Sequence, residues 1–149
     1  MHHRSYWMIG VVAAAGLGLA GCTTASIDLP AIQSEPPSHV EPIEGSELSR
    51  VILSEKAAQR LGIQTAEVAS EERDGAPRQV IPYGAVLYDQ NGEAWTYTSP
   101  EPLTFVRHPI TIETIDGDVA ILTEGPPDGT AVVSVGAAEL NGTEYEVGH

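Results

Sequence analysis

The chain has 149 residues and a formal net charge of −14, because 21 acidic residues outnumber 7 lysine and arginine residues. This balance argues against binding to nucleic acid and against electrostatic docking on anionic lipid, since both need basic surfaces. We interpret the acidity as a solubility feature rather than as a patch for a cationic ligand. The single cysteine, Cys22, excludes an internal disulfide.

The first 21 residues have the layout of a secretory signal peptide. A polar region with Arg4 as its only charge precedes an apolar and small run from Met8 to Ala20. As a helix rising roughly 1.5 Å per residue, this run spans about 20 Å, which is short of the roughly 30 Å hydrocarbon core of a membrane. The run ends in Leu19-Ala20-Gly21-Cys22, which resembles the lipobox of bacterial lipoproteins.

The lipobox resemblance implies cleavage between Gly21 and Cys22 and acylation of the Cys22 sulfur. Because two acyl chains anchor a protein stably where one is marginal, we expect an extracytoplasmic protein held on a bacterial membrane through Cys22. The alternatives are an uncleaved signal anchor and a free cysteine near an ordinary cleavage site.

Residues 22–48 are predicted to be the lipidated cysteine and a disordered tether. Their apolar residues are isolated, and four prolines remove backbone donors: Pro30, Pro36, Pro37 and Pro42. At roughly 3.3 Å per residue, such a tether reaches about 80 Å when stretched.

Residues 49–149 are expected to form one domain. Ser54 is a suitable N-cap for a short helix and Gly62 a suitable stop. The expected elements of this first block are a strand at 50–53, a helix at 55–61, an extended segment at 63–68 and a polar, turn-rich stretch at 69–76.

A second block is β-rich and carries turn signals about every ten residues. Hairpins are expected at Asp89–Gly92 and at Asp116-Gly117, and Pro109 predicts an edge position or a bulge. The expected strands are 79–88, 93–98, 103–112, 119–123, 130–135 and 144–147, with one helical turn at 136–140. The pattern favours a mainly β fold with one short helix, a small antiparallel β-barrel or sandwich.

Four motifs, in this order along the chain, resemble those of periplasmic adaptor subunits (membrane fusion proteins) of resistance-nodulation-division efflux systems, heavy-metal type. Leu61–Thr65 is similar to their Leu-Gly-Ile-x-Thr strand, and Val80–Val86 to their Val-Pro-x-x-Ala-Val strand. Phe105–Ile110 resembles Phe-x-x-Arg-x-Val, and Gly125–Ala137 resembles Gly-Leu-x-x-Gly-x-x-Val-Val-x-x-Gly-Ala. The resemblance implies the membrane-proximal domain of an adaptor and a transporter as partner.

The chain departs from this family in its middle. Full adaptors carry two lipoyl-like half-motifs and a long helical hairpin there, whereas only nine residues separate Val68 from Arg78. If the two blocks form one domain, residues 63–68 pair within the sheet of the second block and Leu61 is buried.

No catalytic motif is found, and we predict that the protein is not an enzyme and has no cofactor. Beyond the signal peptide the histidines are His39, His108 and His149. No metal site is predicted, since Met1 and Met8 leave with the signal and Cys22 is acylated, so no sulfur ligand remains.

We also interpret several further sequence features. Asp89–Glu93 and Asp116–Asp118 have some calcium-ligand character, but we favour hairpin tips. Trp95, Tyr97 and Phe105 are interpreted as core residues rather than a ligand platform. Tyr83 and Tyr88 are expected on opposite faces of one strand, so that one is exposed. Asn141-Gly142-Thr143 matches a glycosylation sequon, and we interpret it as a turn.

The leading hypothesis is an adaptor-like accessory lipoprotein that binds a transporter of the resistance-nodulation-division class or another envelope protein. A solute- or cation-binding lipoprotein and a structural surface protein are the alternatives. The residues that contact a partner are unknown at this stage.

Overall fold

The computed structural model describes residues 36–147 of the chain. The expected signal peptide, the cleavage site at Gly21 and Cys22, and the first part of the expected tether lie outside these residues. None of the helices between residues 36 and 147 has the length and apolar character needed to cross a membrane.

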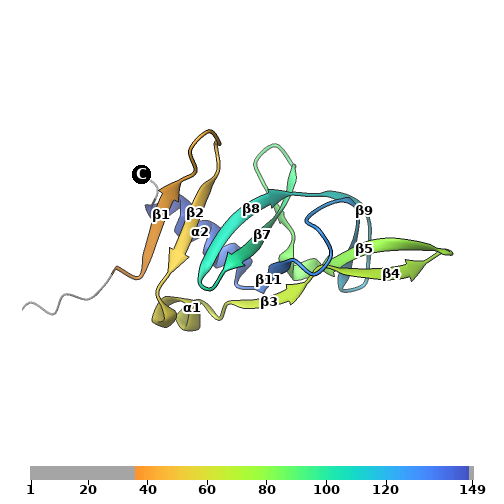
Figure 1. The fold of residues 1–149 in the computed structure, drawn as a ribbon, viewed down its shortest axis with the longest axis horizontal. Coiled ribbons are helices and arrows are strands. Elements are labelled where there is room, and N and C mark those ends of the chain that lie inside the picture. The colour runs from red at the N-terminus through yellow and green to blue at the C-terminus, as the bar shows by residue number, and fades with distance from the viewer. Residues whose placement is uncertain (1–35, 148–149) are drawn as a thin grey trace, which may run out of the picture. The chain divides into compact units, whose positions relative to one another are not determined.

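The described residues form a mainly β fold, as the sequence predicts, with two α-helices rather than one (Figure 1). The helices are α1 (Glu55–Leu61), the 3₁₀-helix η1 (Tyr83–Ala85) and α2 (Ala137–Val147). The strands are β1 (Ser38–Pro42), β2 (Ser49–Leu53), β3 (Gln64–Glu67), β4 (Ala69–Arg73), β5 (Ala76–Pro82), β6 (Leu87–Tyr88), β7 (Ala94–Glu101), β8 (Thr104–Pro109), β9 (Thr111–Asp116), β10 (Val119–Glu124) and β11 (Ala131–Val135).

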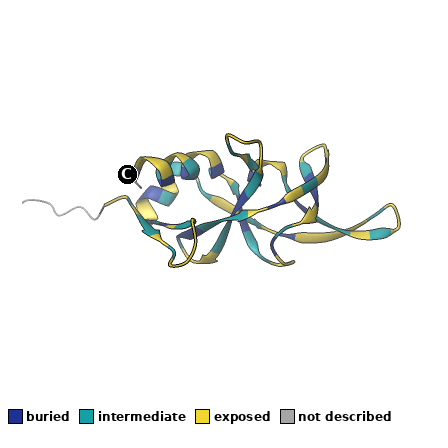
Figure 2. Ribbon diagram, turned by 90° about the horizontal axis from the view of Figure 1, so that it is seen from above, coloured by how far each residue is buried: buried dark blue, intermediate teal, exposed yellow. Residues whose placement is uncertain are grey.

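These strands form two antiparallel sheets. In the larger sheet the order is β1-β2-β8-β7-β11-β3, and β6 pairs with one end of β7. In the smaller sheet the order is β4-β5-β10-β9. One buried cluster belongs to the larger sheet, and a second combines residues of the smaller sheet with Val132 of β11. The burial-coloured ribbon shows the buried positions interspersed along the strands (Figure 2).

The chain leaves the larger sheet for the smaller one at Pro109. The sequence predicts a single strand over 103–112, but Pro109 ends β8, and β9 begins at Thr111. Between them Ile110 is buried in the cluster of the smaller sheet, and its amide donates to Ala94 O at 3.0 Å. The irregularity predicted at Pro109 is therefore the point at which the strand is divided between two sheets.

The prediction that residues 22–48 are all tether is wrong in its last part. Ser38–Pro42 forms β1, which pairs antiparallel with β2 from Ser38↔Leu53 to Pro42↔Ser49. Val40 packs against the core cluster of the larger sheet, which supplies the burial that makes so short a strand stable. The folded domain thus begins before residue 49.

Helix α1 is capped as the sequence predicts. The Ser54 hydroxyl accepts the Ala57 amide at 3.2 Å, and Gly62 ends the helix with φ 67°. Only the burial of Leu61 was predicted wrongly: it is half-buried and packs against the core, while Ala57 is the fully buried residue of the helix.

The two sequence blocks form one domain. Strand β3, from the first block, pairs with β11 of the second, and Val68 N donates to Thr130 O at 2.9 Å. At Gly136 an added Cβ would lie 2.7 Å from Ile63 Cδ1 and 3.0 Å from Leu61 O, so only glycine fits there. The predicted pairing of residues 63–68 is confirmed.

A two-stranded hairpin connects the first sequence block to the second. The stretch expected to be turn-rich, residues 69–76, forms strand β4, which pairs with β5 from Ala69↔Val80 to Arg73↔Ala76. Asp74 and Gly75 make the turn, both with positive φ. Strand β4 is largely exposed and polar, so its sequence lacks the apolar alternation by which strands are normally predicted.

Two further predictions are corrected by the structure. The strand expected over 79–88 ends at Pro82, and η1 follows, so Tyr83 and Tyr88 are both exposed rather than on opposite faces of one strand. The expected turn at 136–140 and strand at 144–147 together form helix α2, which includes the sequon Asn141–Thr143.

Candidate functional site

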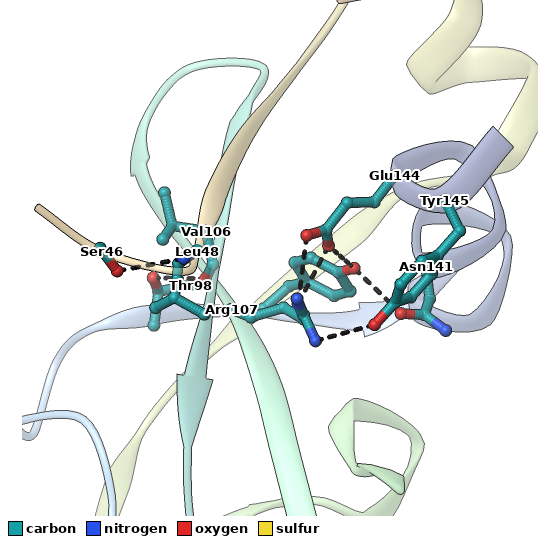
Figure 3. Close-up of polar contacts among 9 residues, drawn as sticks. Ser46, Leu48, Thr98, Val106, Arg107, Asn141, Glu144 and Tyr145 are labelled. Carbon is teal, nitrogen blue, oxygen red and sulfur yellow. Dashed lines mark hydrogen bonds and ion pairs between the residues drawn. The ribbon is translucent and has the colours of Figure 1, made fainter. Parts of the chain in front are cut away.

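An ion pair joins helix α2 to the larger sheet. Arg107 on β8 contacts Glu144 on α2, with 3.1 Å between Nε and Oε2 (Figure 3). Their side chains are only 15% and 6% exposed, so both charges are largely withdrawn from water. A buried carboxylate requires such compensation, because an unpaired charge in the interior is costly.

Tyr97 on β7 completes this arrangement from the core side. Its hydroxyl donates to Glu144 Oε2 and lies 3.2 Å from Asn141 Oδ1. Burial raises the pKa of Tyr97 well above its usual range, and the adjacent Glu144 carboxylate raises it further. We call Tyr97, Arg107, Asn141, Glu144 and Tyr145 the clasp, since they link β7 and β8 to α2.

Two aromatic rings lie against the Arg107 guanidinium. Its Cζ lies 5.4 Å from the centroid of the Trp95 ring and 5.5 Å from that of Tyr145, and Nη1 donates to the Tyr145 hydroxyl at 3.1 Å. Both distances are within the range of cation–π attraction. The guanidinium is therefore fixed by its carboxylate partner and by the two rings.

A groove of about 390 Å³ opens beside the clasp. It lies where α2 faces the β6–β7 hairpin, and it is bounded by aromatic, amide and charged side chains. Its lining residues are Leu87, Tyr88, Asp89, Gln90, Asn91, Trp95, Arg107, Asn141 and Tyr145.

The Asp89–Gly92 loop forms one wall of this groove and is a hairpin tip, as predicted. Asp89 Oδ1 accepts the amides of Asn91 and Glu93 at 2.8 and 2.9 Å. Desolvation acts to raise the pKa of Asp89, but the hydrogen bonds from the Glu93 and Asn91 amides outweigh it and lower the pKa. The carboxylate thus stabilises its own loop.

The second predicted hairpin is also confirmed. Asp116 ends β9 and Val119 begins β10, with Gly117 at φ 60° between them. The Asp116 carboxylate contacts Arg73 of β4. Within residues 36–147 no three His, Cys, Asp or Glu side chains gather into a group that could hold a metal ion.

The aromatic residues singled out in the sequence divide between core and groove. Tyr97 and Phe105 are buried, as expected of core residues, whereas Trp95 lines the groove. His39 and His108 lie apart on β1 and β8, where His39 contacts Glu41 and His108 Nδ1 lies 2.8 Å from Pro109 O.

Sequence reasoning missed the clasp. Arg107 appears only as part of a family motif, and Glu144 was placed on a strand. A usable signal was present in the helical spacing of Ala137, Leu140 and Glu144, which puts the three residues on one face of a helix.

Part of this chain is similar to a solved structure. No protein-family model matches the chain, and no curated protein matches it. Among solved structures, the fold resembles that of a membrane-proximal domain, the module that the sequence motifs resemble.

The structure concerned is the NMR structure of a 180-residue fragment with the N-terminal metal-binding site and the membrane-proximal domain of SilB from Cupriavidus metallidurans CH34. The identity is 22% and the TM-score 0.45, and the match covers 56% of this chain and 48% of that one. The chain therefore corresponds to about half the length of that structure.

Proposed function

We propose that the protein is a non-enzymatic, adaptor-like accessory module that binds a transporter of the resistance-nodulation-division class. We further propose that it is extracytoplasmic and anchored through a lipid on Cys22. The observation that carries the proposal is the pairing of β3 with β11, which joins the two motif-bearing blocks into one domain. In adaptors these blocks are the two halves of the membrane-proximal module.

The β4–β5 hairpin supports the accessory role. It closes the chain within a few residues at the position of the long helical insertion of full adaptors. Without that insertion a module lacks the part that bridges to an outer-membrane channel. What remains is the part that lies against the external face of a transporter.

Photo-crosslinking in the native host tests this function. A photoreactive amino acid is placed at Ile115 or Val135, which are 42% and 47% exposed, so neither substitution disturbs a core. Crosslinked partners are identified by mass spectrometry, with unirradiated cells as the control. We expect a transporter of the resistance-nodulation-division class to be crosslinked.

Other partners would overturn the proposal in distinct ways. An uptake permease as the crosslinked protein would indicate a solute- or cation-binding lipoprotein. Crosslinks confined to envelope structural components would indicate a structural surface protein.

A further inference from the structure

The groove beside the clasp combines aromatic faces with uncharged polar groups. Its two tyrosines, Tyr88 and Tyr145, are 53% and 48% exposed. Its amide side chains are Gln90, Asn91 and Asn141. The Asn141 amide oxygen faces the Tyr97 hydroxyl, which leaves its NH₂ group as a donor.

A charged ligand does not suit this lining. A cation would meet the Arg107 guanidinium, which already occupies the faces of Trp95 and Tyr145. An anion would meet the Asp89 carboxylate, which the loop amides keep ionised. Arg107 would attract an anion only weakly, since Glu144 already compensates the charge of the guanidinium.

A purely apolar ligand does not suit it either. Covering the groove with hydrocarbon would remove water from the side chains of Gln90 and Asn91, which make no hydrogen bond within residues 36–147. Burying a polar group without a hydrogen-bonding partner is unfavourable. The ligand must therefore supply both an apolar face and hydrogen-bonding edges.

We propose that this groove binds a neutral sugar ring of a glycan. The C–H bonds on one face of such a ring pack against the negative face of an aromatic ring, for which the exposed Tyr88 is available. Its hydroxyls both donate and accept, which matches the amides of the lining. The groove volume lies within the usual range for ligand pockets, about 300–1,000 Å³.

This site is independent of the proposed adaptor function. The adaptor assignment rests on the pairing of β3 with β11, whereas the groove is built by the β6–β7 hairpin, β8 and α2. An extracytoplasmic module with both features would contact a transporter and a glycan with different surfaces.

Nuclear magnetic resonance titration of the full chain tests the proposal, in a detergent without a sugar headgroup so that the groove stays free. The probes are the trimers of N-acetylglucosamine and of β-linked glucose, and the reporter is the Trp95 indole N–H signal, assigned by its loss in Trp95→Phe. We expect a saturable shift with at least one trimer. In Tyr88→Ala the dissociation constant should rise about tenfold or more.

Tyr83→Ala is the matched control, because Tyr83 is 44% exposed and lies outside the groove lining. It should bind like the unsubstituted chain. The absence of a saturable shift with both trimers at millimolar concentration would overturn the proposal. So would an unchanged dissociation constant in Tyr88→Ala, or an equal shift produced by a lysine-rich peptide, which would make the groove a cation site.

Discussion

Removing the two charges of the clasp one at a time should cost more stability than removing both together. Glu144→Leu leaves the Arg107 guanidinium without its carboxylate and the Tyr97 hydroxyl without its main acceptor. Arg107→Met leaves the Glu144 carboxylate, 6% exposed, without a counter-charge. The double variant leaves neither charge behind.

The burial of the pair sets the magnitudes. Breaking a buried ion pair from one side typically costs about 3–5 kcal/mol, whereas replacing both partners with apolar residues of similar size is often nearly neutral. The Arg107 side chain is 15% exposed, so we expect each single variant to lose about 3 kcal/mol of stability, the lower end of that range. For the double variant we expect the free energy of unfolding to fall by about 1 kcal/mol, because the Tyr97 hydroxyl loses its acceptor.

Urea unfolding followed by circular dichroism measures the three free energies of unfolding. The slope of each transition should stay constant, which shows that the same surface is exposed in every variant. Additive losses, with the double variant near 6 kcal/mol, would refute the coupling between the two residues. Losses below about 0.5 kcal/mol in both single variants would mean that the pair behaves as an exposed one.

Three shorter predictions concern other residues. Because burial raises the pKa of Tyr97, its proton stabilises the fold up to the ordinary tyrosine pKa of about 10, and this contribution is lost as the pH rises further. Below the alkaline unfolding transition, Tyr97→Phe should therefore show the same tyrosinate absorbance as the unsubstituted chain. Cys22→Ser should abolish labelling by a fatty-acid probe, and equal labelling of both proteins would contradict the lipid anchor. Leu140→Ala, at a fully buried position, should cost about 2–5 kcal/mol, and Leu61→Ala, at a half-buried one, about 1 kcal/mol; equal losses in urea unfolding would contradict these burial assignments.

Elements with strong local signals were predictable. Helix α1 carries its start and stop in Ser54 and Gly62, and the hairpin at Asp89–Gly92 carries a glycine suited to positive φ. In each case the deciding interactions lie within a few residues. The order of the family motifs predicted that residues 63–68 pair within the sheet of the second block, which local patterns alone could not; the structure identifies β11 as the partner.

The remaining elements depend on distant partners. Strand β1 is flanked by prolines and resembles a tether until β2 pairs with it. The end of α2 contains Tyr145 and Val147, which favour strands, and no basic residue stabilises its last turn. The contacts that hold this helix in place come from Arg107 and Tyr97, which are 37 and 47 residues from Glu144.

Strand β1 also has a consequence for the height of the domain above a membrane. With the anchor proposed at Cys22, only residues 23–37 remain to span the gap, which limits the reach to about 50 Å at roughly 3.3 Å per residue. Detaching β1 from β2 would release the segment up to Ser49 and add about 35 Å without changing one tether residue. If the chain is anchored at Cys22, the pairing of these two short strands would set the greatest distance between the membrane and the domain.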